Sequence, residues 1–199
     1  MEIIQFGSYE QGNGIKLIEW LVLTKKNNKA LILSKYALDC QPYNTSTKNV
    51  KWETCTLRTW LNNDFYNAAF NSTEKGKIAS TMLSNADNPN YGIDGGNFTT
   101  DKIFLLSIYD INSVTCGFDN SYDRYDYARR CQPTEYAKAQ GCWVAQNYYC
   151  GNCLWWLRSP GYDSDFAAFV YSSGCVSYNG TGVNNDMAGV RPALWINLE

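Results

Sequence analysis

The first long apolar segment of the chain spans residues 17–23, and Glu19 is its one charged side chain. Apolar residues fall on both alternating faces of this segment, so we predict a strand that is buried on most of both faces. Residues 25–29 are polar, and residues 30–33 are apolar again. The pattern therefore predicts a β-hairpin near the start of the chain.

Helical spacing appears further along. Thr56 can cap a first helix, whose apolar stripe comprises Leu57, Trp60, Leu61, Phe65 and Ala68. Asn71 and Glu74 stand at capping-box spacing and predict a second short helix, and Thr134 caps a third over residues 135–140. Residues 85–100 are rich in turn formers, whereas residues 109–130 are aromatic and charged without a clear period.

The last third of the chain has an apolar start at residues 155–160 and an apolar end at residues 189–195. Between them lies a polar stretch with scattered apolar residues, namely Ala167, Ala168, Val170, Val176 and Val183. Turn formers at residues 172–174 and 179–180 divide it. We predict a short antiparallel meander with Ala168, Val170 and Val176 directed into the core. Alternation then directs Phe169, Tyr171 and Ser177 outward. Tyr178 is also placed outside, but it breaks the alternation unless the turn at residues 179–180 already begins there.

Composition narrows the class of protein. The chain has 199 residues, of which 45% are hydrophobic, and this is enough for one domain with a sizeable core. Seven Trp and fifteen Tyr favour a β-rich fold with a surface suited to binding. The net charge is −2 and no long basic run occurs, so we expect no nucleic-acid partner.

The chain contains no histidine, which excludes Ser-His-Asp and Cys-His catalysis, His-ligated metals and a histidine pH switch. The N-terminus shows no signal peptide, and no apolar run is long enough to span a membrane. We therefore expect a cytoplasmic or phage-associated protein whose eight cysteines are mostly reduced.

Several segments resemble a bacterial domain family of the C-type lectin fold, closest to the formylglycine-generating-enzyme branch. The resemblance is carried by residues 155–160 (WWLRSP) and 189–194 (GVRPAL), and it extends to residues 17–23, 34–40, 52–58 and 133–139. It implies a single α+β domain over residues 1–199, with short helices around antiparallel sheets. It also implies that the strand at residues 17–23 lies beside the one at 190–196, so that the two termini are adjacent.

The resemblance includes the variable proteins of diversity-generating retroelements, in which adenines of chosen codons near the C-terminus are randomised. Asparagine codons treated in this way yield Asn, Asp, Ser, Tyr, Gly, Cys or Phe, but never Trp, Lys, Glu, Gln or Met. Residues 162–186 contain none of those five excluded types. An ordinary meander rich in Asn and Ser would show the same composition.

Three motifs suggest chemistry. Cys150 and Cys153 form a C-x-x-C pair, which could be a redox pair, half of a zinc site, a disulfide or incidental thiols; we favour incidental thiols. The formylglycine-generating enzyme holds copper with cysteines that follow its core segment, whereas this pair precedes Trp155, and this departure disfavours that activity. Asp163-x-Asp165 and residues 184–186 could bind calcium, although turns also use these residue types. We expect Arg158 and Arg191 to be buried. A buried arginine needs a partner, so we favour a structural salt bridge for each.

These observations favour a non-enzymatic module that binds a protein or glycan through residues 147–186, without a cofactor or metal. A copper-dependent oxidase and a structural or virion assembly protein are the alternatives. The candidate contact residues are Asn147, Tyr148, Tyr149, Asn152, Tyr162, Asp163, Ser164, Asp165, Phe169, Tyr171, Ser173, Cys175, Ser177, Tyr178, Asn179, Asn184, Asn185 and Asp186.

Overall fold

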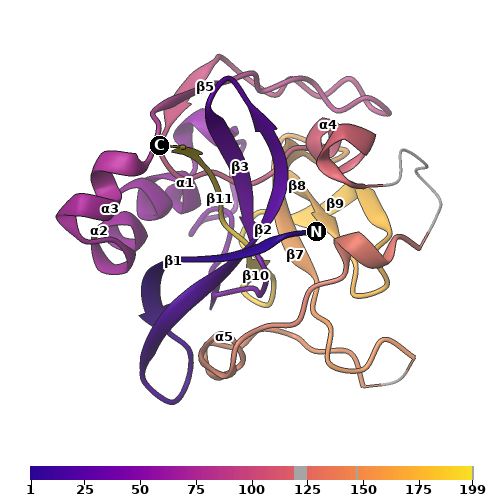
Figure 1. Cartoon of the computed structure of the whole chain (residues 1–199). Coiled ribbons are helices and arrows are strands. Elements are labelled where there is room, and N and C mark those ends of the chain that lie inside the picture. The colour runs from indigo at the N-terminus through magenta and orange to yellow at the C-terminus, as the bar shows by residue number, and fades with distance from the viewer. Residues whose placement is uncertain (119–124, 147, 199) are drawn as a thin grey trace.

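The computed structural model describes residues 1–118, 125–146 and 148–198 (Figure 1). This part of the chain is α+β, and it forms a four-stranded, a five-stranded and a two-stranded sheet in which nearly all neighbouring strands are antiparallel. Short helices surround the sheets, as the sequence predicts. The two-stranded sheet pairs β5 (Thr81–Leu83) with β6 (Thr99–Asp101).

The four-stranded sheet has the order β1-β2-β3-β11, with β1 at Ile3–Glu10, β2 at Ile15–Lys26, β3 at Lys29–Ser34 and β11 at Ala193–Asn197. The predicted hairpin is confirmed, and its turn uses Asn27 and Asn28 at positive φ, a conformation that Asn tolerates. Leu33 pairs with Leu21 on one side and with Ala193 on the other. The segments at 17–23 and 190–196 therefore share a sheet, but the predicted direct contact is wrong because β3 lies between them.

One face of β2 is more buried than the other. Ile18, Trp20 and Val22 are buried, whereas Leu17 is 54% exposed and Glu19 is half-buried. The prediction of burial on both faces is therefore wrong for the first half of this strand. The reason is that an antiparallel sheet at the surface needs only one face against the core.

The first helical segment contains a π turn. α1 (Thr56–Trp60) continues through the π-helical residues Leu61–Phe65 into α2 (Tyr66–Ala69). Its N-cap is Cys55, whose sulfur accepts a hydrogen bond from the Arg58 amide at 3.4 Å, and Thr56 is the first helical residue. A π turn adds one residue to the helical repeat. The buried stripe therefore ends on Ala69, and the predicted Ala68 is exposed.

The other two predicted helices are confirmed with their caps. α3 (Ser72–Lys77) begins at Asn71, which forms the capping box with Glu74. α5 (Glu135–Ala139) begins at Thr134, whose hydroxyl accepts from the Ala137 amide at 3.1 Å. A further helical turn, α4 (Ile108–Ile111), and 3-10 turns at Trp52–Thr54, Val114–Cys116 and Tyr127–Arg129 lie in the loops.

The five-stranded sheet contains the predicted meander. Its order is β4-β10-β7-β8-β9, with β4 at Asp39–Cys40, β10 at Gly189–Val190, β7 at Trp155–Pro160, β8 at Phe166–Val170 and β9 at Val176–Gly182. The turn at residues 172–174 is confirmed by the Gly174 N–H, which donates to the Tyr171 carbonyl. The predicted turn at residues 179–180 is wrong, because these residues lie inside β9. There Gly180 adopts a φ of +73° at a bulge, and a β-carbon would lie 2.3 Å from the Ala167 carbonyl oxygen.

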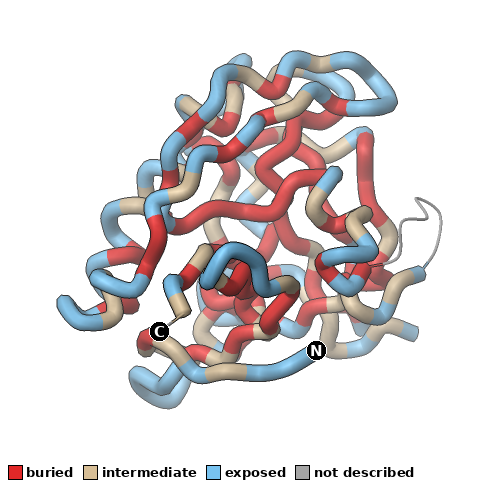
Figure 2. Tube along the Cα trace, turned by 45° about the horizontal axis from the view of Figure 1, so that its top comes forward, coloured by how far each residue is buried: buried red, intermediate tan, exposed pale blue. Residues whose placement is uncertain are grey.

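Both faces of the meander are covered, because nearly all residues of β7 and β8 are buried. Figure 2 shows the buried segments in red, running through the interior of the molecule. Trp156, which pairs across the sheet with Phe169, packs on one face against Tyr43 at 5.8 Å. On the other face the Asn112 side-chain amide donates to the Tyr178 hydroxyl at 2.7 Å. Ala168, Val170 and Val176 are buried as predicted. However, Phe169, Ser177 and Tyr178 are buried too, so their predicted outward placement is wrong. Ser173, a predicted contact residue, is also buried.

Candidate functional site

The candidate contact residues divide by burial. Those with exposed side chains are Tyr148, Tyr162, Asp163, Tyr171, Asn179, Asn184 and Asp186. Half-buried ones are Tyr149, Asn152, Ser164, Asp165, Cys175 and Asn185, while Asn147 lies outside the described residues. Because the strands of the meander are antiparallel, Tyr171 at its β8–β9 turn and Tyr162 before β8 lie at opposite ends. The candidates therefore do not form the single continuous surface that the sequence suggested.

A cluster of aromatic rings around one arginine lies at the β8–β9 turn. The rings of Tyr125 and Tyr149 stack with their centroids 5.9 Å apart and their planes 19° from parallel. The guanidinium of Arg130 lies 3.8 Å from the ring centroid of Tyr127 and 5.0 Å from that of Tyr149. Cation–π contacts of this kind hold an exposed surface in a defined arrangement.

The backbone fixes this cluster to the turn. Arg130 Nε donates to the Ser173 carbonyl at 3.1 Å. Gly174 packs so closely on the segment before Arg130 that an added β-carbon would lie 2.2 Å from the Asp126 carbonyl oxygen. Arg129, the residue before Arg130, is fully buried, and its Nε donates to the Ile111 carbonyl at 2.9 Å. A buried anchor thus supports exposed rings.

We call the surface formed by Tyr125, Tyr127, Arg130, Tyr149 and Tyr171 the turn face. Tyr125 is 58% exposed, Tyr127 is 77% exposed and Tyr171 is 47% exposed. Desolvation and the nearby Tyr125 raise the pKa of Tyr149. Like any tyrosine at neutral pH, it is protonated and can donate a hydrogen bond. Tyrosines with limited side-chain freedom and one arginine are the residue types that dominate binding surfaces.

At the other end of the meander, the side chains are held by several contacts with one another. Tyr162 packs on Phe166 at 4.5 Å and on Tyr91 at 6.3 Å, and the Tyr91 hydroxyl donates to the Asn179 side chain at 2.6 Å. The Asp163 carboxylate accepts from the Ser164 amide. Among the described residues, no three His, Cys, Asp or Glu side chains converge on a point where a metal could bind. The three carboxylates among the suggested calcium ligands, Asp163, Asp165 and Asp186, therefore do not form such a group.

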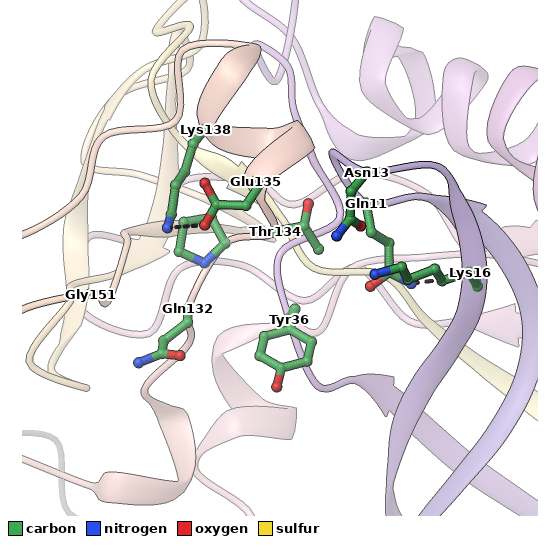
Figure 3. Close-up of a pocket in the computed structure, with 10 residues that line it drawn as sticks. Gln11, Asn13, Lys16, Tyr36, Gln132, Thr134, Glu135, Lys138 and Gly151 are labelled. Carbon is green, nitrogen blue, oxygen red and sulfur yellow. Dashed lines mark hydrogen bonds and ion pairs between the residues drawn. The ribbon is translucent and has the colours of Figure 1, made fainter.

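A polar hollow of about 430 Å³ lies between α5 and the loop that joins β1 to β2 (Figure 3). Glu135 and Lys138 from α5 form an ion pair at 2.6 Å on one side, and Gln11 and Lys16 face it from the other side. The lining residues are Gln11, Asn13, Lys16, Tyr36, Gln132, Pro133, Thr134, Glu135, Lys138 and Gly151. This lining can hold a small polar molecule, but it contains no cysteine, and its one carboxylate is paired with Lys138.

The C-x-x-C pair does not act as a unit. Cys150 is exposed, whereas Cys153 is fully buried. All eight cysteines are free. The predicted salt bridge is confirmed for Arg158, whose NH1 lies 2.6 Å from an Asp110 oxygen. Arg191 instead donates from Nε to the Ser34 carbonyl at 2.9 Å, and its guanidinium lies 4.9 Å from the Trp155 ring centroid.

Sequence reasoning missed Tyr125, Tyr127 and Arg130. They lie in the stretch at residues 109–130, whose aromatic and charged residues show no period, because its described part holds short turns only: the end of α4 and the 3-10 turns Val114–Cys116 and Tyr127–Arg129. The density of Tyr beside Arg was the available signal, and it marks a surface rather than an element of secondary structure.

This arrangement defines an α+β domain with an exposed aromatic surface. The chain belongs to the family DUF6273, a domain of unknown function whose model matches residues 27–198. Comparisons with curated proteins and with solved structures gave no match. The described helices include none with the length and apolar character needed to cross a bilayer.

Proposed function

We propose that this chain is a non-enzymatic binding module of the C-type lectin fold that contacts a protein or glycan through the turn face. The observation that carries the proposal is the Tyr125–Tyr149 stack with Arg130 beside it, locked onto the β8–β9 turn. The cluster is rigid at its base and exposed at its tips. Little side-chain entropy is lost when such a surface binds.

We further propose that the module is a variable protein of a diversity-generating retroelement, in the cytoplasm or on a phage. The structure limits which positions could vary without loss of folding. Substitution is tolerable at exposed Tyr162, Tyr171 and Asn179, but not at buried Phe169 and Tyr178. A neighbouring reverse transcriptase gene with a near-copy of the coding sequence for residues 162–186 would support this reading. The adenines of that near-copy should fall in the codons of the exposed residues.

The binding proposal is tested by selection. The full chain is screened against a randomised peptide display library and a glycan array. Binders are then measured against the double variant Tyr127→Ser/Tyr149→Ser and against Phe98→Ser, a control that removes a 68% exposed aromatic residue just before β6. We expect the double variant to weaken binding by about tenfold or more, since aromatic anchors carry most binding energy. Equal affinities for the double variant and wild type would overturn the proposal, as would a failure of both screens.

A further inference from the structure

Two adjoining hollows lie where α4, β5 and β11 meet. One has a volume of about 520 Å³ and the other of about 320 Å³. Five residues line both of them, namely Leu83 of β5, Tyr109 and Asp110 of α4, Arg158 of β7 and Trp195 of β11. We call the two together the Trp195 hollow. No residue of the turn face lines it, so the two surfaces are separate.

Two aromatic side chains line both parts of the Trp195 hollow. Tyr109 is 52% exposed and Trp195 is half-buried. The backbone of Trp195 is held on both sides, since this residue pairs with Leu31 of β3 and its carbonyl accepts from the Ala79 N–H at 2.8 Å. Trp195 therefore offers a flat apolar surface from a fixed strand, and Tyr109 adds a second ring.

Between these rings the hollow contains an anchored carboxylate with one free oxygen. Asp110 Oδ2 accepts from the Ser107 N–H and hydroxyl, each at 2.8 Å, and from Arg158 NH1 at 2.6 Å. Asp110 Oδ1 has no hydrogen bond in the described part of the chain. The buried side-chain atoms that lack a partner there are Asn85 Oδ1 and Arg158 Nε, so solvent reaches Asp110 Oδ1. An acceptor held in this way is already oriented for a donor on a ligand.

The charges around the hollow decide between classes of ligand. Arg158 neutralises Asp110, so no net negative charge is left to hold a cation. Lys25 and Lys26 line the larger part; Lys25 pairs with Glu2, but Lys26 forms no ion pair among the described residues. An anion would be attracted by Lys26 but repelled by the free oxygen of Asp110. A neutral ligand with several hydroxyl groups suits both, because a hydroxyl can donate to Asp110 and accept from Lys26.

A sugar ring combines these properties. The C–H groups on its faces are apolar and can pack on aromatic rings, whereas its hydroxyl groups lie around its edge. Sites for small molecules usually have volumes of about 300–1,000 Å³, and both parts of the hollow fall in that range. We propose that the Trp195 hollow is a second binding site, which holds a neutral saccharide of one or two rings against Trp195 and Tyr109 and accepts a hydroxyl hydrogen bond at Asp110 Oδ1.

The test uses the full chain and free glucose, galactose, mannose and N-acetylglucosamine at millimolar concentrations. Saturation-transfer NMR detects binding. The Trp195 indole N–H resonance, identified by its absence in Trp195→Phe, shows where the sugar binds. We expect at least one of the four sugars to bind and to shift that resonance. The amino-sugar and uronic-acid counterparts of that sugar should bind more weakly, since each carries a charge.

Variants then test the individual contacts. Tyr109→Ser removes an exposed ring and should weaken sugar binding by about tenfold. Asp110→Asn should also weaken it, because an amide oxygen is a weaker acceptor than a carboxylate oxygen. If Asp110→Asn does not fold, Tyr109→Ser still decides the matter. The control Tyr127→Ser/Tyr149→Ser changes only the turn face and should bind the sugar as wild type does.

Several results would overturn the inference. These are a panel in which no sugar binds, a charged counterpart that binds more tightly than the neutral sugar, and equal affinities for Tyr109→Ser and wild type. Loss of sugar binding in Tyr127→Ser/Tyr149→Ser, with an unmoved Trp195 resonance in wild type, would place the sugar on the turn face. That result would contradict the second site and support the proposed function, so the two proposals fail separately.

Discussion

Tyr171 and Tyr178 occupy two regions of the meander that resemble one another in sequence. Each tyrosine stands two or three residues before a glycine, in a segment of Ser and Asn. Yet Tyr171 is 47% exposed at the β8–β9 turn, and Tyr178 is 7% exposed within β9. The Tyr178 hydroxyl is bonded to Asn112, and its carbonyl accepts from the buried Asn88 amide at 2.8 Å.

The difference shows that composition alone does not separate contact residues from core residues here. Alternation predicts one solvent-exposed face, but this sheet has protein on both faces, and most residues of β7 and β8 are buried. The turn face is therefore built where β8 turns into β9 and where the segment of residues 125–130 meets it. Surface variation in this region is compatible with a fixed interior.

The largest expected effect is at the centre of the meander. Val170 is fully buried, and Val170→Asp would place an unpaired charge in the core. Such a charge costs several kcal/mol, which is comparable with the total stability of a domain. We expect the variant to be unfolded by circular dichroism at 25 °C, whereas Val170→Ala should fold. A folded Asp variant would mean that this strand is not interior.

Tyr178→Ser should cause the second-largest loss of stability. It removes a buried ring and the hydroxyl that accepts from Asn112. Loss of a large buried aromatic residue costs roughly 3–5 kcal/mol. Urea unfolding curves should show this loss, and Tyr178→Phe should lose less because the ring is kept. A Tyr178→Ser variant as stable as wild type would place this tyrosine on the surface.

The Asp110–Arg158 ion pair beside the meander should have an intermediate, pH-dependent effect. Burial raises the pKa of Asp110, but the charge of Arg158 and the hydrogen bonds from Ser107 outweigh it and hold the pKa below its usual value. The stabilisation is therefore present above about pH 4 and is lost as the pH falls through the lowered pKa. Asp110→Asn should cost about 1–3 kcal/mol at neutral pH.

The pH dependence of the stability of Asp110→Asn tests whether the Asp110 charge stabilises the fold. Between pH 5 and pH 2, wild type should lose more stability than Asp110→Asn, so that the gap between their urea midpoints narrows with acid. A gap that stays constant would show that the Asp110 carboxylate does not contribute through its charge.

Tyr171→Ser should have the smallest effect on stability. The ring centroids of Tyr171 and Phe169 are 4.6 Å apart, but Tyr171 is 47% exposed. Surface changes usually alter stability by less than about 0.5 kcal/mol. The melting temperature should stay near that of wild type and of the control Phe98→Ser. A loss of stability as large as that of Tyr178→Ser would remove the distinction between the exposed β8–β9 turn and the buried part of β9.

Local patterns predicted much of the fold. The hairpin, the meander, the Asn71 and Thr134 caps and the turn at residues 172–174 depend on neighbouring residues, and all of them are present. Strand β1 was not predicted, because its apolar residues are interrupted by Gly7 at a φ of +68° and by polar residues. The π turn that moves burial to Ala69 has no sequence signal that spacing could reveal.

The candidate site was harder to predict for a physical reason. Burial of Phe169 and Ser177 depends on the distant residues around Tyr43, and the turn face depends on residues 125–130 reaching the turn at Gly174. Contacts over such separations leave no periodic pattern.

The most direct test of the turn face is backbone hydrogen exchange with and without a selected peptide or glycan. The ligand should slow exchange in residues 125–130, 148–150 and 171–175, and leave residues 11–16 and 134–138 of the polar hollow and residues 162–166 unchanged. Protection confined to the hollow around Lys16 and Lys138, or to the end that carries Tyr162, would contradict the account.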